Sequence, residues 1–155
     1  MIREVQTEHR LELLTDGVKG LFCIENYLGG TYYLTADEVY TEGDYIVIQE
    51  SKNNSRGKLP SKNDILDGLF KLIIFENLDK LEFAGKTVNF KTRLKLTGNL
   101  KGKIELPAPE EEIKNFSILN NLSSNKTNLL MLLNKEAKIN SFSVHIEGNK
   151  EIKNP

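Results

Sequence analysis

The sequence predicts an α+β fold with an α/β/α-like arrangement, in which a mixed β-sheet is flanked by helices. The prediction depends on two strand-like runs between residues 31 and 52, a helix-like run after them, and further alternating runs toward residue 147. The chain has 155 residues, of which 39% are hydrophobic, and this suffices for one buried core. We therefore expect a single domain over residues 1–155.

Residues 31–52 have the pattern of a β-hairpin. β-branched and aromatic residues dominate residues 31–35 and 45–48, and the turn-forming run 42–44 lies between them. The second strand of this hairpin is predicted to be buried on one face, because Ile46 and Ile48 alternate with other residues along it.

The length of the turn decides which side chains share a face of the hairpin. If a two-residue turn begins at Glu42, Asp37 lies opposite Ile48 and diagonal to Glu50. Asp37, Glu50 and Lys52 then point to the same face of the sheet. A turn of three or five residues would separate them.

Residues 61–77 are predicted to form a helix. Ser61 is a favourable N-cap, and Asp64 can complete a capping box. Apolar residues at helical spacing predict one buried face, made of Ile65, Leu66, Leu69, Phe70, Ile73 and Ile74. Strands are expected within 18–28, 86–106 and 141–147 and helices near 111 and over 127–138, whereas residues 5–14 fit a helix or a strand.

The few cysteines and histidines restrict the metal chemistry. Cys23 is the single cysteine, which excludes an internal disulfide and a cysteine cluster. His9 and His145 lie far apart, whereas a zinc site usually needs several nitrogen or sulfur ligands. A metal would be held by carboxylates, which indicates Mg²⁺, with Mn²⁺ as a substitute. No apolar run spans a bilayer and no signal peptide is present, so we expect a cytoplasmic protein without a membrane partner.

Charge is unevenly distributed along the chain. Residues 1–50 have a net charge of −7, residues 51–103 of +7, and residues 104–155 of −1. The basic middle part can face a polyanion such as double-stranded DNA. A solvated lysine-rich surface explains the same charge equally well.

Three charged residues have the side chains that metal-dependent phosphodiester hydrolysis can use. Asp37 precedes the buried run of the second strand, and Glu50-Ser51-Lys52 follows it. Two carboxylates can hold a divalent cation, which polarises the phosphoryl group and acidifies a bound water. A lysine beside them can stabilise the developing negative charge. The alternative interpretation is an exposed ion pair where the strand leaves the core.

Residues 31–80 resemble the PD-(D/E)xK nuclease superfamily, and within it the type II restriction endonucleases. The resemblance lies in the run before and including Asp37, in Glu50-Ser51-Lys52, and in the capped helix; Ala36 departs from the family pattern, which has proline before the aspartate. It implies a restriction-endonuclease-like core in which Asp37, Glu50 and the Ser51 backbone carbonyl hold Mg²⁺ and Lys52 assists the water. It also implies a homodimer on a palindromic duplex.

Other residues are candidates for supporting roles. Relatives of this kind often add a carboxylate from a helix before the hairpin, and Glu8 and Glu12 are one helical turn apart. Polar and basic residues after the second strand are candidates for contacts with DNA phosphates and bases, or form only a polar loop; they are Asn53, Asn54, Arg56, Lys58 and Lys62.

The sequence therefore predicts a Mg²⁺-dependent, sequence-specific DNA endonuclease, either compact or the catalytic part of a longer protein. A structure-selective nuclease such as a junction resolvase is a second possibility. A non-catalytic DNA-binding or protein-interaction module on the same fold is a third. A binding domain without a nucleic-acid role is favoured if Asp37 and Glu50 face opposite sides of the sheet.

Overall fold

The computed structural model describes residues 4–8, 13–14, 17–83 and 85–149. This part of the chain has the α+β composition that the sequence predicts. In chain order its elements are β1 (Glu4–Glu8), β2 (Leu13–Leu14), β3 (Gly17–Glu25), β4 (Thr31–Glu42), β5 (Tyr45–Asn53), α1 (Lys62–Glu76), β6 (Lys80–Phe83), β7 (Lys86–Gly98), β8 (Lys103–Leu106), α2 (Glu110–Leu119), α3 (Ser124–Asn140) and β9 (Ser143–Gly148).

The described residues divide into two compact units. The first comprises the described parts of residues 1–50 and 70–93, and the second comprises those of 51–69 and 94–155. Three elements, β5, α1 and β7, begin in one unit and end in the other. The division therefore falls within elements of secondary structure, and a single domain stays the prediction.

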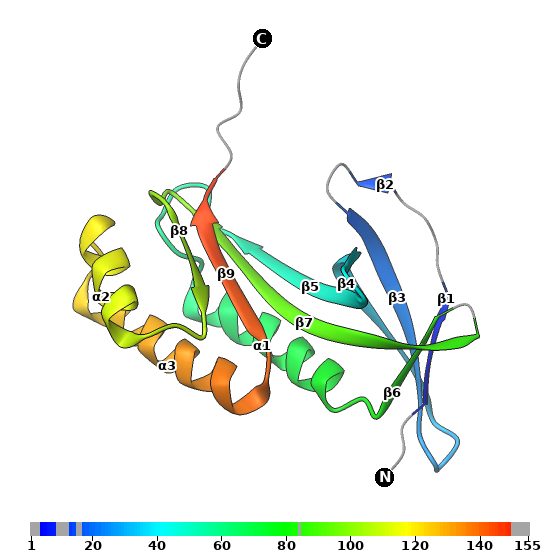
Figure 1. Ribbon diagram of the computed structural model, residues 1–155. Coiled ribbons are helices and arrows are strands. Elements are labelled where there is room, and N and C mark those ends of the chain that lie inside the picture. Colours follow the sequence, from blue (N-terminus) through cyan, green and yellow to red (C-terminus); the bar gives the residue numbers. More distant parts are fainter. Residues whose placement is uncertain (1–3, 9–12, 15–16, 84, 150–155) are drawn as a thin grey trace. The chain divides into compact units, whose positions relative to one another are not determined.

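In the first unit the strands follow the order β5-β4-β3-β1-β6-β7, with β2 paired to β3 (Figure 1). The sheet is mixed, because β1 is antiparallel to β3 and parallel to β6. Its hydrophobic core is formed by Phe22, Ile24, Ala36, Ile48, Phe75, Leu78 and Leu81. The rings of Phe22 and Phe75 pack with their centroids 4.8 Å apart, which joins β3 to the second half of α1.

The β4–β5 hairpin is confirmed, but its predicted register is wrong. Glu42 pairs with Tyr45, so the two turn residues are Gly43 and Asp44. Val39, and not Asp37, is the partner of Ile48. Gly43 has a φ of +59°, and turns of type II′ place glycine at this first central position.

Helix α1 begins after Ser61, as predicted. The Ser61 hydroxyl accepts a hydrogen bond from the Asp64 backbone N–H at 3.1 Å and donates one to the Asp64 carboxylate at 2.6 Å. The predicted buried face is partly wrong, since Leu66, Phe70 and Ile73 are exposed. Apolar residues cover much of this helix, and the stripe that is buried consists of Ile65, Leu72 and Phe75.

The described residues of the N-terminal segment form strands, whereas the sequence fitted a helix or a strand. Residues 4–8 form β1 because they pair with β3 on one side and with β6 on the other. Glu8 therefore ends a strand and does not lie in the helix that was expected for it, and Glu12 lies outside the described residues. The short strand β6 was not predicted, whereas the other expected strands and helices are present.

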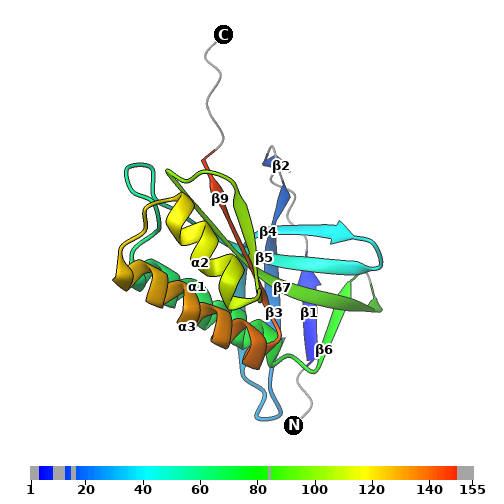
Figure 2. The same ribbon diagram turned by 60° about the vertical axis from the view of Figure 1, so that its left-hand side comes forward.

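In the second unit β9 lies between β7 and β8, and β5 also pairs with β7. Helices α2 and α3 lie side by side (Figures 1 and 2). The buried Asn134 of α3 accepts a hydrogen bond from the Ala108 N–H at 2.8 Å and donates one to the Ala108 carbonyl at 3.0 Å. None of the helices in the described residues is long and apolar enough to cross a membrane.

Candidate active site

Glu50 is the most deeply buried charged residue of the predicted site. It follows the buried Val47 and Ile48 on β5, and its side chain is 1% exposed. Its two carboxylate oxygens each lie 3.1 Å from the Lys71 Nζ atom. A buried carboxylate is unfavourable unless a cation or hydrogen-bond donors compensate it, and Lys71 supplies a cation.

Lys71 connects α1 to both strands of the hairpin. Besides Glu50 on β5, its ammonium donates a hydrogen bond to the backbone carbonyl of Thr35 on β4 at 3.1 Å. Thr35 is two residues before Asp37. The Lys71 side chain is 33% exposed, so its charged end lies between the strands and solvent.

Asp37 lies near Glu50 along the hairpin. The last paired residues of β4 and β5 on this side are Glu38 and Gln49, and Asp37 and Glu50 are the next residues in their strands. The turn is even, so the strand parity predicted for residues 38–42 is correct. Asp37 itself is half-buried.

A β-bulge interrupts the alternation at Asp37. Val39 pairs with Val18 and Ala36 with Gly20, so Asp37 and Glu38 together lie opposite one residue of β3. Ala36 and Val39 both pack into the same hydrophobic cluster although they are three positions apart. The face to which Asp37 points therefore does not follow from alternation, and its role as a metal ligand stays a prediction.

Lys52 lies two residues beyond Glu50 on β5 and belongs to the second unit. Strand alternation places both on one face of β5. The Lys52 side chain runs along α1 at Gly68, where an added Cβ atom would lie 3.5 Å from Lys52 Cε. Gly68 and Lys71 are three residues apart and lie on the same side of α1.

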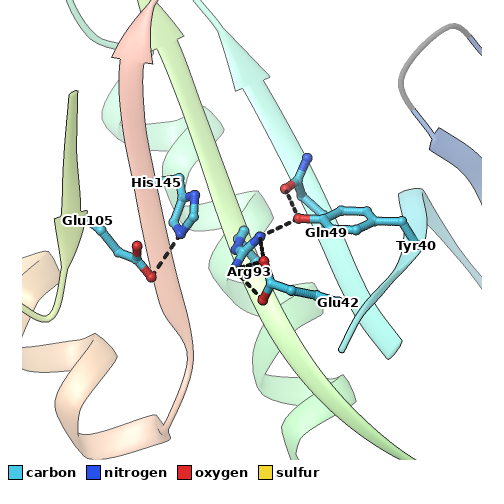
Figure 3. Close-up of polar contacts among 6 residues, drawn as sticks. All are labelled: Tyr40, Glu42, Gln49, Arg93, Glu105 and His145. Carbon is cyan, nitrogen blue, oxygen red and sulfur yellow. Dashed lines mark hydrogen bonds and ion pairs between the residues drawn. The ribbon is translucent and has the colours of Figure 1, made fainter. Parts of the chain in front are cut away.

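A second polar cluster includes residues that directly precede or follow Val39 on β4 and Ile48 on β5. Gln49 donates to Glu38 at 3.0 Å and accepts from the Tyr40 hydroxyl at 3.2 Å. Arg93 of β7 contacts the Tyr40 hydroxyl and forms an ion pair with Glu42 at 3.1 Å (Figure 3). Donors and acceptors match along this chain of contacts, which indicates a structural role in joining β4, β5 and β7.

Three residues predicted to contact DNA have structural contacts in the second unit. The Asn54 amide shapes its own loop by donating to the Leu59 carbonyl at 2.8 Å and accepting from the Gly57 N–H at 2.7 Å. Asn53 accepts from the Thr97 hydroxyl at 2.8 Å. Lys58 binds backbone carbonyls just after α2, including that of Asn121 at 3.0 Å.

Arg56 and Lys62 are exposed, as a phosphate contact requires. Lys62 also lines a hollow of about 630 Å³ whose other residues come from residues 54–61 and from the first turns of α3. Lys126 lines it too, and the described lining residues include no aspartate or glutamate.

The described residues contain no group of three or more His, Cys, Asp and Glu side chains that could hold a metal ion. The predicted ligands are two carboxylates and one backbone carbonyl, which is not such a group. His145 of β9 lies across from Glu105 of β8, with its Nε2 atom 2.9 Å from the Glu105 carboxylate (Figure 3). His9 lies outside the described residues.

Sequence reasoning missed Lys71, although a signal for it was present. The alternation of Ile46 and Ile48 places Glu50 on a buried face, and a buried carboxylate requires a compensating cation. Helix α1 contains two lysines, and Lys71 lies next to its buried stripe whereas Lys62 is in its first turn.

Comparisons with known proteins add no family to this description: no family model matches the chain, and no curated protein or solved structure matches it either.

Proposed function

We propose that the chain is a Mg²⁺-dependent DNA endonuclease whose reacting residues are Asp37, Glu50 and Lys52. The observation that carries the proposal is the burial of Glu50 at the end of β5, with a cation 3.1 Å from both of its oxygens. A residue in that position can hold a divalent cation in a fixed place, which an exposed ion pair cannot do.

The residues present fit a divalent cation. Carboxylates and a backbone carbonyl are the hard oxygen donors that Mg²⁺ prefers, and Glu50, Asp37 and the Ser51 carbonyl are of this kind. A positive charge already lies beside the Glu50 carboxylate, because the Lys71 ammonium contacts it. When bound, Mg²⁺ would polarise the phosphoryl group and lower the pKa of a water molecule.

Each residue of the chain has a separate task in this proposal. Glu50 would hold the cation from a buried strand position, and Asp37 would complete the ligand set from the bulge in β4. Lys52 orients the attacking water and stabilises the negative charge that develops on the phosphate. Arg56 and Lys62 hold DNA phosphates outside the reacting centre.

The order of the hairpin, α1 and β7 is consistent with a restriction-endonuclease-like core. A hairpin that ends in Glu50-x-Lys52 is followed by the capped helix α1, and β7 after it pairs with β5. A type II restriction enzyme that acts as a homodimer on a palindromic site is the most specific form of the proposal.

Incubation of the purified protein with supercoiled plasmid and phage DNA, with and without Mg²⁺, tests the proposal. Discrete Mg²⁺-dependent fragments are expected from the wild type, a loss of about 10²-fold or more in Lys52→Ala, and no loss in the exposed control Lys135→Ala. Equal cleavage by the wild type and Lys52→Ala would contradict the role of Lys52. Absence of any cleavage by folded wild-type protein, with Mg²⁺ or Mn²⁺, would contradict the proposed activity of this chain.

The internal pairing of Glu50 with Lys71 favours one second candidate, a DNA-binding or protein-interaction module without catalysis. In such a module the ion pair is purely structural, and a divalent cation has no effect on the protein. Binding of a plasmid fragment that is independent of Mg²⁺ and occurs without cleavage would support it.

A further inference from the structure

We propose that Lys71 is a built-in competitor of the divalent cation: its ammonium holds the cation position beside Glu50 in the metal-free protein and withdraws when metal binds. The inference rests on the proposed function, because it takes Glu50 as a metal ligand. It adds a mechanism by which the protein controls its own affinity for metal.

The contacts of Lys71 are those that a metal ion would also make. Its Nζ atom lies 3.1 Å from both carboxylate oxygens of Glu50 and 3.1 Å from the carbonyl oxygen of Thr35. All three are hard oxygen acceptors of the kind that divalent cations use. A metal bound to Glu50 would repel the ammonium at so short a distance, and the repulsion is stronger where water is excluded.

The two partners differ in their freedom to move. The Lys71 side chain is 33% exposed and has a flexible four-carbon stem, so its ammonium can turn to water while α1 stays in place. The Glu50 side chain is 1% exposed and stands on a hydrogen-bonded strand. An exchange of cations would therefore occur at a fixed carboxylate, with Lys71 as the group that moves.

The exchange has a consequence for the metal-free protein. Without Lys71, Glu50 would be a buried carboxylate that lacks its nearby cation whenever metal is absent, and this destabilises a fold. With Lys71 the fold is retained at low metal concentration, and the affinity for metal is lower because the ammonium must be displaced.

Two measurements on the full chain test the inference. Electron paramagnetic resonance titration gives the Kd of Mn²⁺ for the wild type, Lys71→Gln and the control Lys135→Gln, which removes the same charge from an exposed position. We expect Lys71→Gln to bind Mn²⁺ about tenfold more tightly than the other two. In the wild type, Mg²⁺ is expected to speed the acetylation of Lys71 by an amine-reactive reagent, read by mass spectrometry, and to leave Lys135 unchanged.

The outcomes separate this inference from the proposed function. If Mn²⁺ binds the wild type and binding is lost in Glu50→Gln, but neither the acetylation of Lys71 nor the affinity of Lys71→Gln changes, the competition is overturned and the metal site stands. If neither the wild type nor Lys71→Gln binds Mn²⁺, the metal site of the proposed function fails, and the competition with it. The acetylation measurement decides the question even if Lys71→Gln does not fold.

Discussion

Glu50 and Lys71 form an ion pair whose partners have unequal access to water. The carboxylate is buried, whereas a third of the lysine side chain is exposed. Removal of the lysine therefore leaves a charge that cannot be solvated, and removal of the carboxylate leaves one that can. Substitution of Lys71 is therefore expected to lower the free energy of unfolding more than substitution of Glu50 does.

We expect Lys71→Met to lower the free energy of unfolding by about 2–3 kcal/mol in the absence of metal, less than for a fully buried pair because Lys71 is partly exposed. Glu50→Gln should lower it by only about 1 kcal/mol, since Lys71 can then turn to solvent. Urea denaturation in the presence of a chelator measures both values. A larger loss in Glu50→Gln than in Lys71→Met would contradict the burial assigned to Glu50.

Glu76 of α1 provides a test that depends on pH. Burial raises the pKa of its carboxyl group above the usual value of 4.5, and the hydrogen bond from Thr92 opposes the rise. The folded state therefore holds the proton more strongly than the unfolded state, and stability falls as pH rises through the range above 4.5.

Glu76→Gln should remove this part of the pH dependence, because the amide does not titrate and its oxygen can still accept from Thr92. Thermal unfolding over a range of pH is expected to show the variant more stable than the wild type at neutral pH, with the difference shrinking toward acid. A difference that stays constant with pH would show that Glu76 has an ordinary pKa.

Among the elements, those with strong local patterns were predictable from the sequence and those that depend on pairing were not. Helix α1 has an N-cap and a dense apolar pattern, and the β4–β5 hairpin has two strand-forming runs around a glycine. The register was wrong because Glu42-Gly43 and Gly43-Asp44 can both serve as two-residue turns, and the pairing of Glu42 with Tyr45 selects the second. The strand β6 was missed because its four residues form a strand only through pairing with β1 and β7.

The candidate site likewise has features that local patterns predict and features that depend on contacts with other elements. Glu50 and Lys52 were placed on one face of β5 by alternation alone, which needs no knowledge of the other elements. The bulge at Asp37 and Glu38 arises from pairing with β3, and no local pattern of residues indicates it. Lys71 was missed for a related reason, because its contact with Glu50 joins residues 21 positions apart.

Substitution of Asn134 tests how α3 packs in the second unit. Its amide satisfies both the N–H and the carbonyl of Ala108, and all of these groups are buried. Asn134→Ala should lower the free energy of unfolding by about 2–3 kcal/mol, because two backbone groups lose their partner. Asn128→Ala, at an exposed position of the same helix, should change it by less than about 0.5 kcal/mol. Equal effects in urea denaturation would contradict the anchoring role of Asn134.

At the scale of the whole molecule, the proposed binding of DNA depends on charge and on assembly. The net charge of +7 on residues 51–103 includes Lys52, Arg56, Lys62 and Lys71, which have separate tasks in the proposal. Double-stranded DNA would neutralise the exposed ones, whereas Lys71 is already paired with Glu50. The homodimer stays a prediction, which sedimentation of the protein with and without a palindromic duplex can test.

Asp37 and Glu38 are consecutive carboxylates in the bulge of β4, and they allow the most direct test of the central claim. Glu38 accepts a hydrogen bond from Gln49, whereas Asp37 is the proposed metal ligand. Mg²⁺-dependent plasmid cleavage should fall by about 10²-fold or more in Asp37→Asn and change by only a few-fold in Glu38→Gln, with both variants folded by circular dichroism. Retention of cleavage in Asp37→Asn, or equal loss in both variants, would contradict the assignment of Asp37, Glu50 and Lys52 as a metal-dependent nuclease site.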